Sequence, residues 1–474
     1  MNNIKTLNRK KPSIAERPIK VLQFGEGNFL RGFVNWIIDV MNEKTDFNGN
    51  VRIIQPLSMG LAPMIEKQDG LYHVLLEGIF RGETVQDSRM ITSVSGAMNP
   101  FNDYSEYLAL ADNTDLKFVI SNTTEAGIVF DDNDMDQTTL PITFPGKLTA
   151  LLYRRYETFQ GKKDAGLVII PCELIEKNGE QLESCVLKYA KLWDLPQEFS
   201  QWIIQANSFC NTLVDRIVPG FPKDNIREIQ EKLGFEDNLV VMAEPFHLWV
   251  IEGPENLKEI FPAEKAGLEV KFVKDLTPYR TRKVRILNGA HTALVPVAYL
   301  EGLRTVRESL EDADVGKFIE DTIYSEIIPT LDLAEDELKQ FAADVLDRFR
   351  NPFIHHELAS IALNSVSKFK VRVLPSLLAY KKVKGEWPDN LTYSFASLIM
   401  FYNPEVGCPT NDEEAYCKFF EQVWSAGSLE TVVEQTLNQT NFWGEDLTLH
   451  PGLVEKVTEQ LQELTSKQAD LNKN

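Results

Sequence analysis

A lysine, an asparagine and a histidine with the spacing Lys283-x4-Asn288-x2-His291 form the group best suited to chemistry, inside residues 282–299. At about 100° per residue on a helix, Asn288 lies about 140° and His291 about 80° from Lys283, so all three could point into one cleft. A lysine whose pKa is lowered by burial can donate or accept a proton, an amide can stabilise a developing alkoxide, and an imidazole can hold a substrate hydroxyl. The group therefore indicates carbonyl reduction, although a helix with a solvated lysine and a core histidine has the same spacing.

A glycine-rich turn follows an apolar run near the N-terminus and reads Gly25-Glu26-Gly27-Asn28-Phe29-Leu30-Arg31-Gly32. Glycines let the backbone approach a pyrophosphate, which the amides of a following helix can bind. The third glycine of GxGxxG is absent, because Leu30 stands there and Gly32 comes two residues late. The turn predicts a dinucleotide site, while a glycine turn without a ligand remains the alternative.

The kind of dinucleotide stays open on these residues alone. An acidic residue usually ends the next strand and bonds the ribose hydroxyls, whereas an arginine there accepts a 2′-phosphate. This chain has Gln55-Pro56 at that point, so neither NAD nor NADP is favoured. Glu26 in the turn either bonds a ribose hydroxyl or is solvated.

The elements that would position these residues fall into two parts. Strand-like runs alternate with helical patterns in the first part, which predicts a parallel sheet covered by helices. The strand patterns lie at 19–24, 51–55, 118–121, 167–170 and 239–243, and the helical ones at 29–42, 147–160 and 179–193. Helical spacing alone recurs later, at 304–322, 335–350, 411–425 and 453–464, before a polar end at 465–474 that we expect to fray. We expect an α/β domain over 1–274 and a mostly α-helical substrate or catalytic domain over 275–474.

The bulk composition narrows the class of protein. A chain of 474 residues is too long for one core, and a net charge of -21 argues against a nucleic-acid partner. Five cysteines without a CxxC pair suit a reducing compartment and argue against a metal site built from them. No run of 18 apolar residues occurs, and the basic N-terminus precedes no apolar stretch, so we expect a cytoplasmic protein without a membrane partner.

Several separated motifs over residues 20–375 resemble those of the mannitol dehydrogenase family, the polyol-specific long-chain dehydrogenases. GxGxFxR near the N-terminus and Lys-x4-Asn-x2-His on a later helix are the first two. The others are Ser121-Asn122-Thr123-Thr124-Glu125, Asn178-Gly179, Val214-Asp215-Arg216-Ile217-Val218-Pro219, Ala243-Glu244-Pro245-Phe246 and Arg348-Phe349-Arg350-Asn351-Pro352. Their common order is more specific than any one of them.

The resemblance implies an N-terminal Rossmann-type domain that binds NAD, a helical C-terminal domain, hydride transfer and no metal. By position it implies that Lys283 is the acid/base, that Asn178 and Asn288 form the oxyanion site, and that His291 positions the substrate. It also implies a set of cofactor-binding residues, which are Gly25, Gly27, Asn28, Phe29, Arg31, Ser121, Asn122 and Thr123.

The substrate is expected from finer features of the same resemblance. Lys368 matches a substrate-contacting lysine, while a basic residue that many relatives carry two turns earlier is Ser360 here, with Arg372 as a possible substitute. The variants QFGEGNFLRGF and SNTTEAGI resemble members that reduce D-tagaturonate to D-altronate with NADH in hexuronate catabolism. The alternatives are the epimeric ketone D-fructuronate, a neutral hexitol, or a nicotinamide sensor without catalysis. The oligomeric state is not predicted.

Overall fold

A computed structural model describes residues 4–10, 14 and 16–471, and the chain divides into two compact units. The first unit spans Met1–Glu77 and Val85–Leu276, and the second spans Gly78–Thr84 and Thr277–Asn474. The boundary at Leu276 lies close to the expected residue 274. The short segment Gly78–Thr84 belongs to the same unit as the C-terminal helices. The prediction of one boundary, with all earlier residues in the first domain, did not include this segment.

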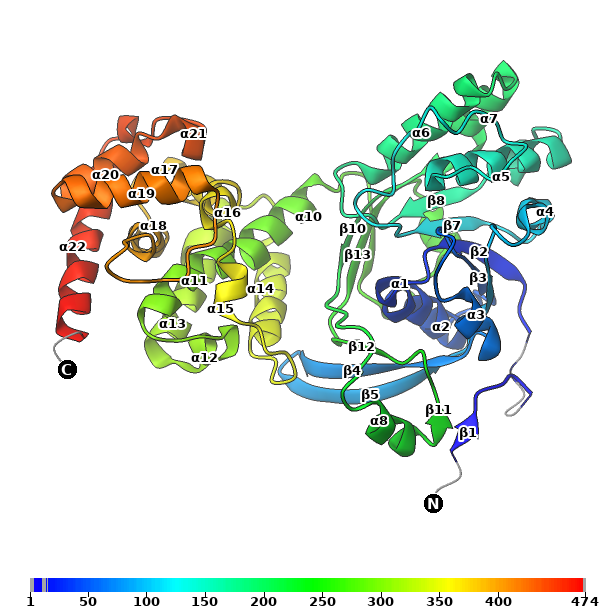
Figure 1. Cartoon of the computed structure of the whole chain (residues 1–474), viewed down its shortest axis with the longest axis horizontal. Helices are drawn as coiled ribbons and strands as arrows, with labels where there is room; N and C mark the ends of the chain where they lie inside the picture. Colours follow the sequence, from blue (N-terminus) through cyan, green and yellow to red (C-terminus); the bar gives the residue numbers. More distant parts are fainter. Residues whose placement is uncertain (1–3, 11–13, 15, 472–474) are drawn as a thin grey trace. The chain divides into compact units, whose positions relative to one another are not determined.

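The first unit is built on a six-stranded sheet in the order β6-β3-β2-β7-β8-β9, with all neighbouring strands parallel. Numbered along the chain, this is the order 3-2-1-4-5-6 of a dinucleotide-binding fold, whose ligand lies beyond the carboxyl ends of the strands where the order reverses. The reversal falls between β2 and β7 (Figure 1). The strands are β2 (Ile19–Phe24), β3 (Asn50–Ile54), β6 (Val94–Met98), β7 (Phe118–Ser121), β8 (Val168–Pro171) and β9 (Ser208–Phe209).

Each face of this sheet has its own core. Alternating residues of a strand point to opposite faces, so Val21 packs with α2 (Val34–Lys44) on one side. Leu22 and Phe24 pack on the other side with α5 (Phe144–Phe159), α6 (Asn178–Leu192) and α7 (Gln197–Ala206). The expected parallel sheet with helices on its faces is confirmed.

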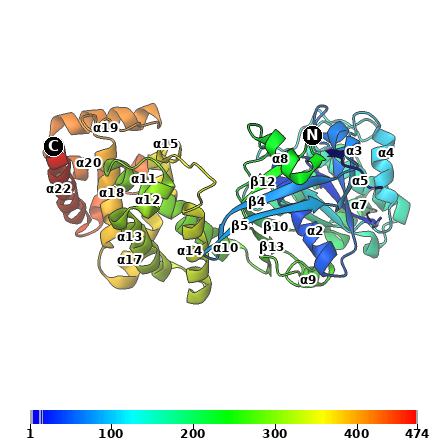
Figure 2. The ribbon, with the colours of Figure 1, turned by 90° about the horizontal axis from the view of Figure 1, so that it is seen from below.

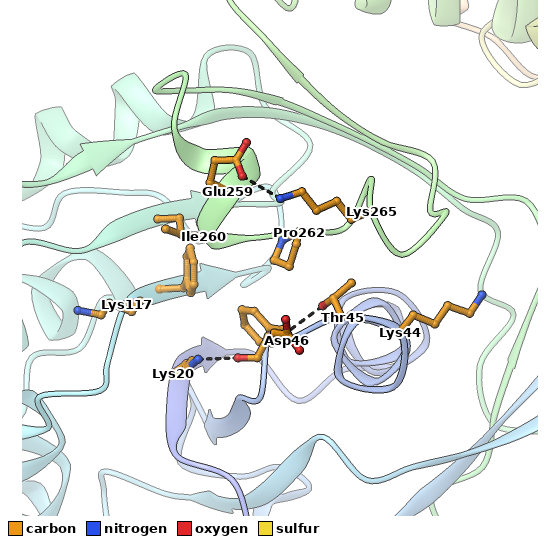
Figure 3. Close-up of a pocket in the computed structure, with 11 residues that line it drawn as sticks. Lys20, Lys44, Thr45, Asp46, Lys117, Glu259, Ile260, Pro262 and Lys265 are labelled. Atoms are coloured by element: carbon orange, nitrogen blue, oxygen red, sulfur yellow. Dashed lines mark hydrogen bonds and ion pairs between the residues drawn. The ribbon is translucent and has the colours of Figure 1, made fainter.

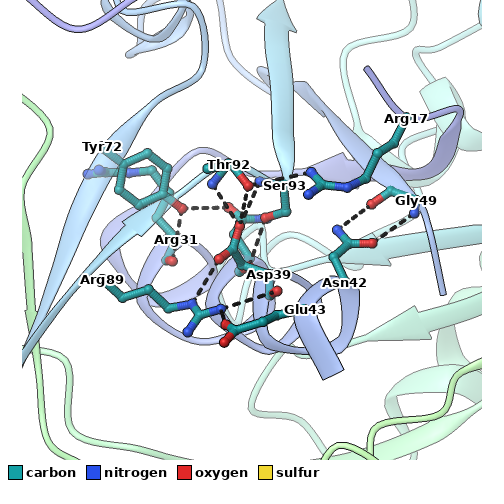
Figure 4. A network of polar contacts seen from close by, with 11 residues as sticks. Arg17, Arg31, Asp39, Asn42, Glu43, Gly49, Tyr72, Arg89, Thr92 and Ser93 are labelled. Atoms are coloured by element: carbon teal, nitrogen blue, oxygen red, sulfur yellow. Dashed lines mark hydrogen bonds and ion pairs between the residues drawn. The ribbon is translucent and has the colours of Figure 1, made fainter. Parts of the chain in front are cut away.

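Helix α2 is joined to the strands beside it by a buried carboxylate. Asp39 accepts hydrogen bonds from the backbone N–H groups of Thr92 and Ser93, at 2.7 and 3.0 Å, and from Arg89 Nε at 2.8 Å (Figure 4). Glu43, one turn later and mostly exposed, pairs with the same arginine. The Asp39 carboxylate therefore fixes α2 to the segment between β5 (Glu83–Ile91) and β6.

Some local predictions for the first unit were wrong. The helix expected over 29–42 is two helices, α1 (Asn28–Gly32) and α2, because Phe33 leaves the helical region with φ −121° and ψ −75°. The run at 239–243 yields only β12 (Val241–Ala243), which pairs with β4 (Tyr72–Phe80) outside the main sheet, in the order β12-β4-β5 (Figure 2). A further sheet of β10 (Asn211–Asp215), β13 (Leu248–Glu252) and β14 (Val270–Val273) was not predicted.

The second unit is helical over its described residues beyond Thr277, as expected. Its central element is a continuous run of α10 (Thr277–Arg282), a π-helical turn η3 (Lys283–Asn288) and α11 (Gly289–Leu300). Helices α14 (Glu335–Phe349), α16 (Ser365–Arg372) and α18 (Asp389–Phe401) pack around this run.

Two helix predictions for this unit were wrong in detail. The stretch 304–322 is broken into α12 (Val306–Glu311) and α13 (Ala313–Asp321), because Asp312 caps α13 with its side chain. The polar end expected to fray continues α22 (Leu453–Leu471) as far as the structure describes it. Of the described helices, none combines the length and apolar character needed to cross a membrane.

Candidate functional site

The glycine turn lies directly beyond β2, at the carboxyl edge of the sheet. Phe24, Ile54 and Ser121 are neighbours in register, so the residues that follow them meet at this edge. Gly25 has φ +113°, and a Cβ there would lie 2.7 Å from the Asn122 carbonyl oxygen, so only glycine fits. At Gly27 a Cβ would meet no atom within 4 Å, which leaves room for a ligand against the backbone.

Gly32 does what the third glycine of the motif usually does. A Cβ at this position would lie 2.9 Å from Val241 Cγ1 and 3.2 Å from Val218 Cγ1. The glycine therefore lets α1 pack closely against these two side chains, which is the role of the third glycine in dinucleotide-binding turns.

The segment Ser121–Thr123 is held in place by a buried glutamate. Glu173 accepts hydrogen bonds from Ser121 Oγ at 3.0 Å and from the Thr123 N–H and Oγ1 at 2.9 and 3.0 Å. Burial raises the pKa of Glu173, and these hydrogen bonds oppose the rise. Asn122 donates from Nδ2 to the Cys172 carbonyl oxygen, so the whole segment is fixed beside the Gly25 turn.

Arg31 is buried, and its guanidinium bonds to the protein. Nε donates to the Glu26 carbonyl oxygen at 3.0 Å, and Nη2 donates to Asn28 Oδ1 at 2.7 Å. Nη1 donates to the Leu239 carbonyl oxygen, and the Tyr72 hydroxyl donates to the Arg31 carbonyl oxygen (Figure 4). Arg31 and Asn28 therefore stabilise the turn, and Phe29 stacks on Phe33 with ring centroids 5.0 Å apart.

Asn178 is also committed to internal hydrogen bonds. Its Nδ2 lies 3.0–3.2 Å from the carbonyl oxygens of Pro171 and Glu173 and from Thr212 Oγ1. Its Oδ1 accepts from the Thr212 N–H at 2.9 Å, and the side chain is fully buried. The amide connects the end of β8 to β10, an arrangement that supports a positioning role in place of the oxyanion contact implied by the resemblance.

A separate cavity of about 530 Å³ opens at the other edge of the sheet (Figure 3). Lys20 in β2 and Lys117, just before β7, lie at the amino-terminal ends of their strands, opposite the glycine turn. Lys265 pairs with Glu259 at 2.8 Å in the same cavity. Dinucleotides bind at carboxyl ends, so this cavity is not part of the glycine-turn site.

In the second unit, the π-helical turn changes how Lys283 and Asn288 are related. A π-helix pairs residues five apart in the chain, which is the separation of these two residues. The 140° expected from α-helical geometry is therefore wrong, because the wider turn brings Lys283 and Asn288 toward a common face. Single π-turns inside α-helices are frequent at functional sites.

His291 follows on α11 and is enclosed by aromatic and basic groups. Its ring stacks on Phe349 with centroids 3.9 Å apart and an interplanar angle of 15°, and meets the His356 ring edge-on at 5.2 Å. Burial and the charges of His356, Arg348, Arg372 and Lys368 lower the pKa of His291 well below its usual value. The imidazole is neutral near pH 7, and among the described residues its buried Nε2 has no hydrogen-bond partner.

The three permanently or usually positive side chains among these groups form the basic cluster, which consists of Arg348, Lys368 and Arg372. Arg348 comes from α14, and the other two come from α16 one turn apart. Burial and Arg372 lower the pKa of Lys368, whose Nζ donates to the Ile361 carbonyl oxygen at 2.8 Å. Helix α16 can approach α11 closely because Gly289 has no side chain. A Cβ at this position would lie 2.9 Å from the Arg372 carbonyl oxygen.

The structure thus brings Lys283, Asn288, His291, Lys368 and Arg372 into one group of packed helices. Sequence reasoning missed three neighbours of His291, namely Arg348, Phe349 and His356. Arg348 and Phe349 stand in the Arg348–Pro352 motif, and their place at the end of an amphipathic helix was the available signal. His356 lies in an irregular segment whose path the sequence does not indicate.

Comparison with known proteins assigns both units. The mannitol dehydrogenase Rossmann domain model matches residues 19–263, and the mannitol dehydrogenase C-terminal domain model matches residues 275–465. The chain belongs to the mannitol dehydrogenase family. A relative named altronate oxidoreductase, from Bacillus subtilis (strain 168), is 50% identical over 94% of this chain and 93% of its own length.

Two solved structures share the fold of this chain. A substrate-free D-sorbitol dehydrogenase is similar with a TM-score of 0.77 and 21% identity, covering 96% of this chain and 99% of that one. The mannitol 2-dehydrogenase of Pseudomonas fluorescens, solved with NAD and D-mannitol, has a TM-score of 0.63 and 20% identity, covering 100% and 98%.

Proposed function

We propose that this chain is an NAD-dependent oxidoreductase that interconverts D-tagaturonate and D-altronate, with Lys283 as acid/base. The relatives named altronate oxidoreductase support it, since their identity of 46–50% extends over nearly the full length. The observation that carries the substrate class is the basic cluster beside a neutral His291, in a chain with a net charge of -21. As part of this proposal the reaction takes place in the cytoplasm, in hexuronate catabolism.

The residues of the first unit fit a dinucleotide. The strand order reverses beside the Gly25 turn, and the backbone at Gly27 is open to a ligand. Gly25, Gly27 and the segment Ser121–Thr123 would hold the cofactor, while Asn28, Phe29 and Arg31 keep the turn in shape. When bound, the nicotinamide supplies a hydride to the ketone carbon in reduction and takes it back in oxidation.

The proton is handled by residues of the second unit. In reduction the ketone oxygen gains a proton from the Lys283 ammonium, and in oxidation the neutral amine takes it back. The amide of Asn288 donates a hydrogen bond to the developing alkoxide, and the π-helical turn supports this pairing with Lys283. Asn178 is assigned to positioning the β8 end, since its amide is committed internally.

The basic cluster would bind the substrate carboxylate. A surface field decays over about 8 Å at physiological ionic strength, so the strongly negative chain does not prevent local capture of an anion. Charged donors from two helices can meet both oxygens of one carboxylate. The neutral imidazole of His291, with its unbonded Nε2, is suited to a substrate hydroxyl and adds no competing charge.

The test is a substrate panel with NADH and the full chain, following NADH absorbance with D-tagaturonate, D-fructuronate and D-fructose. We expect the highest kcat/KM for D-tagaturonate. A higher value for D-fructuronate would identify the epimeric keto-uronate as the substrate, and a higher value for D-fructose would favour a hexitol dehydrogenase. A sensor would bind NADH without turnover, but it has no need of the Lys283, Asn288 and His291 set.

A further inference from the structure

Strand β3, after which dinucleotide-binding folds usually carry the acidic residue that binds the ribose hydroxyls, ends here without an acidic residue. Residues 55–61, which follow β3, read QPLSMGL. Gln55 takes the position of the usual acid, and both ends of its amide are used within this loop. Its Nε2 donates to the Leu57 carbonyl oxygen at 2.8 Å, and its Oε1 accepts from the Ala62 N–H at 3.0 Å. Gln55 therefore shapes the loop and is not available to a ribose.

A carboxylate reaches this place from a different strand. Glu26 is the middle residue of the Gly25–Gly27 turn that follows β2, and its carboxylate accepts hydrogen bonds from its own backbone N–H and from that of Leu61. The side chain thus bridges the glycine turn and the loop after β3. The Glu26 carboxylate lies beside Gln55, which takes the position of the ribose-binding acid of dinucleotide-binding folds.

The loop is built to admit this side chain. A Cβ at Gly60 would lie 2.1 Å from Glu26 Oε1 and 2.7 Å from Gln55 Oε1. Gly60 is not among the glycines with positive φ, so it is required for space and not for backbone conformation. A side chain at position 60 would displace the Glu26 carboxylate.

The Glu26 carboxylate is partly buried, and burial is the largest influence on its pKa, which is raised from the ordinary value. Burial raises the pKa of Glu26, while the two backbone N–H donors and the charge of Arg31 lower it. Arg31 also donates to the Glu26 carbonyl oxygen, so the backbone of this residue is fixed as well. A carboxylate in a fixed position can accept two hydroxyl donors and repel a phosphate without first reorganising.

We infer that Glu26 binds the ribose hydroxyls of the dinucleotide and excludes NADP. The inference rests on the proposed function, because it requires that the glycine turn binds a nicotinamide dinucleotide. It assigns the preference for NAD over NADP to Glu26, in the turn that follows β2, and not to a residue at the end of β3. A 2′-phosphate carries about two negative charges near pH 7, so it would be placed against a like charge.

The experiment measures binding and not turnover. Dissociation constants for NADH and NADPH are determined by fluorescence titration of the full chain and of Glu26→Gln, which keeps the shape of the side chain. The control is Glu259→Gln, an exposed carboxylate of the same unit that changes the net charge equally (Figure 3). We expect the ratio of the NADPH to the NADH dissociation constant to fall at least about tenfold in Glu26→Gln and to stay within about threefold in the control.

A second variant guards against a simple folding defect. Gly60→Ala keeps the carboxylate but displaces it, and it should also weaken NADH binding, with an unfolding midpoint measured for each variant. A parent ratio that persists in Glu26→Gln would overturn the inference and leave the proposed function standing. A parent that binds NADPH more tightly would overturn it too, whereas a parent that binds neither nucleotide would refute the proposed function itself.

Discussion

Replacing Arg372 by alanine should raise KM for D-tagaturonate far more than KM for D-fructose, which lacks the carboxylate. Arg372 is partly buried on α16, and its charge is among those that lower the pKa of His291. We expect the guanidinium to contact the carboxylate of a substrate held at His291. Lys368 and Arg348 remain in the variant, so one contact is lost and the cluster persists.

The size of the effect follows from the environment of Arg372. A hydrogen bond to a charged group contributes about 1.5–3 kcal/mol, which corresponds to roughly 10–150-fold in an equilibrium constant. Solvent screens a partly exposed side chain, so we expect the lower part of this range, about 10–30-fold in KM. For D-fructose the change should stay below about threefold, because no charge is paired with the arginine.

The assay is kcat and KM for both substrates, with NADH saturating, in the parent, Arg372→Ala, Lys368→Ala and a control. Arg285→Ala is the matched control, since Arg285 is a partly buried arginine of the same unit, in the turn η3, and donates to Ser376 Oγ at 3.0 Å. Parallel losses on both substrates in Arg372→Ala and Lys368→Ala would show that neither residue recognises the carboxylate. The hexitol reading would then gain support.

Three further predictions concern the proton, the imidazole and the fold. Lys283→Ala should lower kcat by about 10²–10⁴-fold while the NADH dissociation constant is unchanged, and a kcat within tenfold of the parent would contradict acid/base catalysis. Because the pKa of His291 is lowered in the folded state, the unfolded chain takes up a proton below about pH 6.5 that the folded chain does not, so stability falls as the pH falls. Urea unfolding at several pH values should show that the free energy of unfolding depends less on pH in His291→Asn than in the parent. An equal pH dependence in the two proteins would rule out this effect of His291. Asp39→Asn should lower the free energy of unfolding by about 3 kcal/mol. Glu43→Gln, on the exposed side of Arg89, should lower it by less than about 1 kcal/mol. Similar losses in the two variants would refute the role given to Asp39.

Much of the first unit was predictable because buried parallel strands are short apolar runs followed by helices. The parallel sheet and the glycine turn follow from that pattern, whereas the strand order and the strands β6 and β9 were not predicted. The hairpin of β4 and β5 was not predicted. Strand β5 is mostly exposed and lacks the two-residue alternation of a half-buried strand. The break at Phe33 directly follows Gly32, and a glycine commonly marks the end of a helix, so the sequence held a signal that the prediction of one helix over 29–42 did not use.

The candidate group Lys283, Asn288 and His291 was predicted from residue types, but the π-helical turn that carries the first two was not predicted. The sequence around Lys283 contains no feature that distinguishes a π-turn from an α-turn, because hydrogen-bond spacing is decided by packing around the helix. The commitments of Asn178 and Arg31 to internal hydrogen bonds were likewise hidden, since their partners include Thr212 and Leu239, far away in the chain. Long-range partners of this kind are set by the fold and not by local spacing.

The grouping of Gly78–Thr84 with the C-terminal helices has a consequence for how the protein is made. The Gly82 N–H donates to Asp347 Oδ2 at 2.8 Å, across 265 residues of chain. At about 5–20 residues per second, the ribosome completes Asp347 roughly 13–53 s after Gly82. During that interval the first unit can close its sheet, but the hairpin tip still lacks its acceptor. A C-terminal fragment that starts at Thr277 would lack the tip altogether, so expressing that fragment together with a peptide of residues 72–91 should stabilise it.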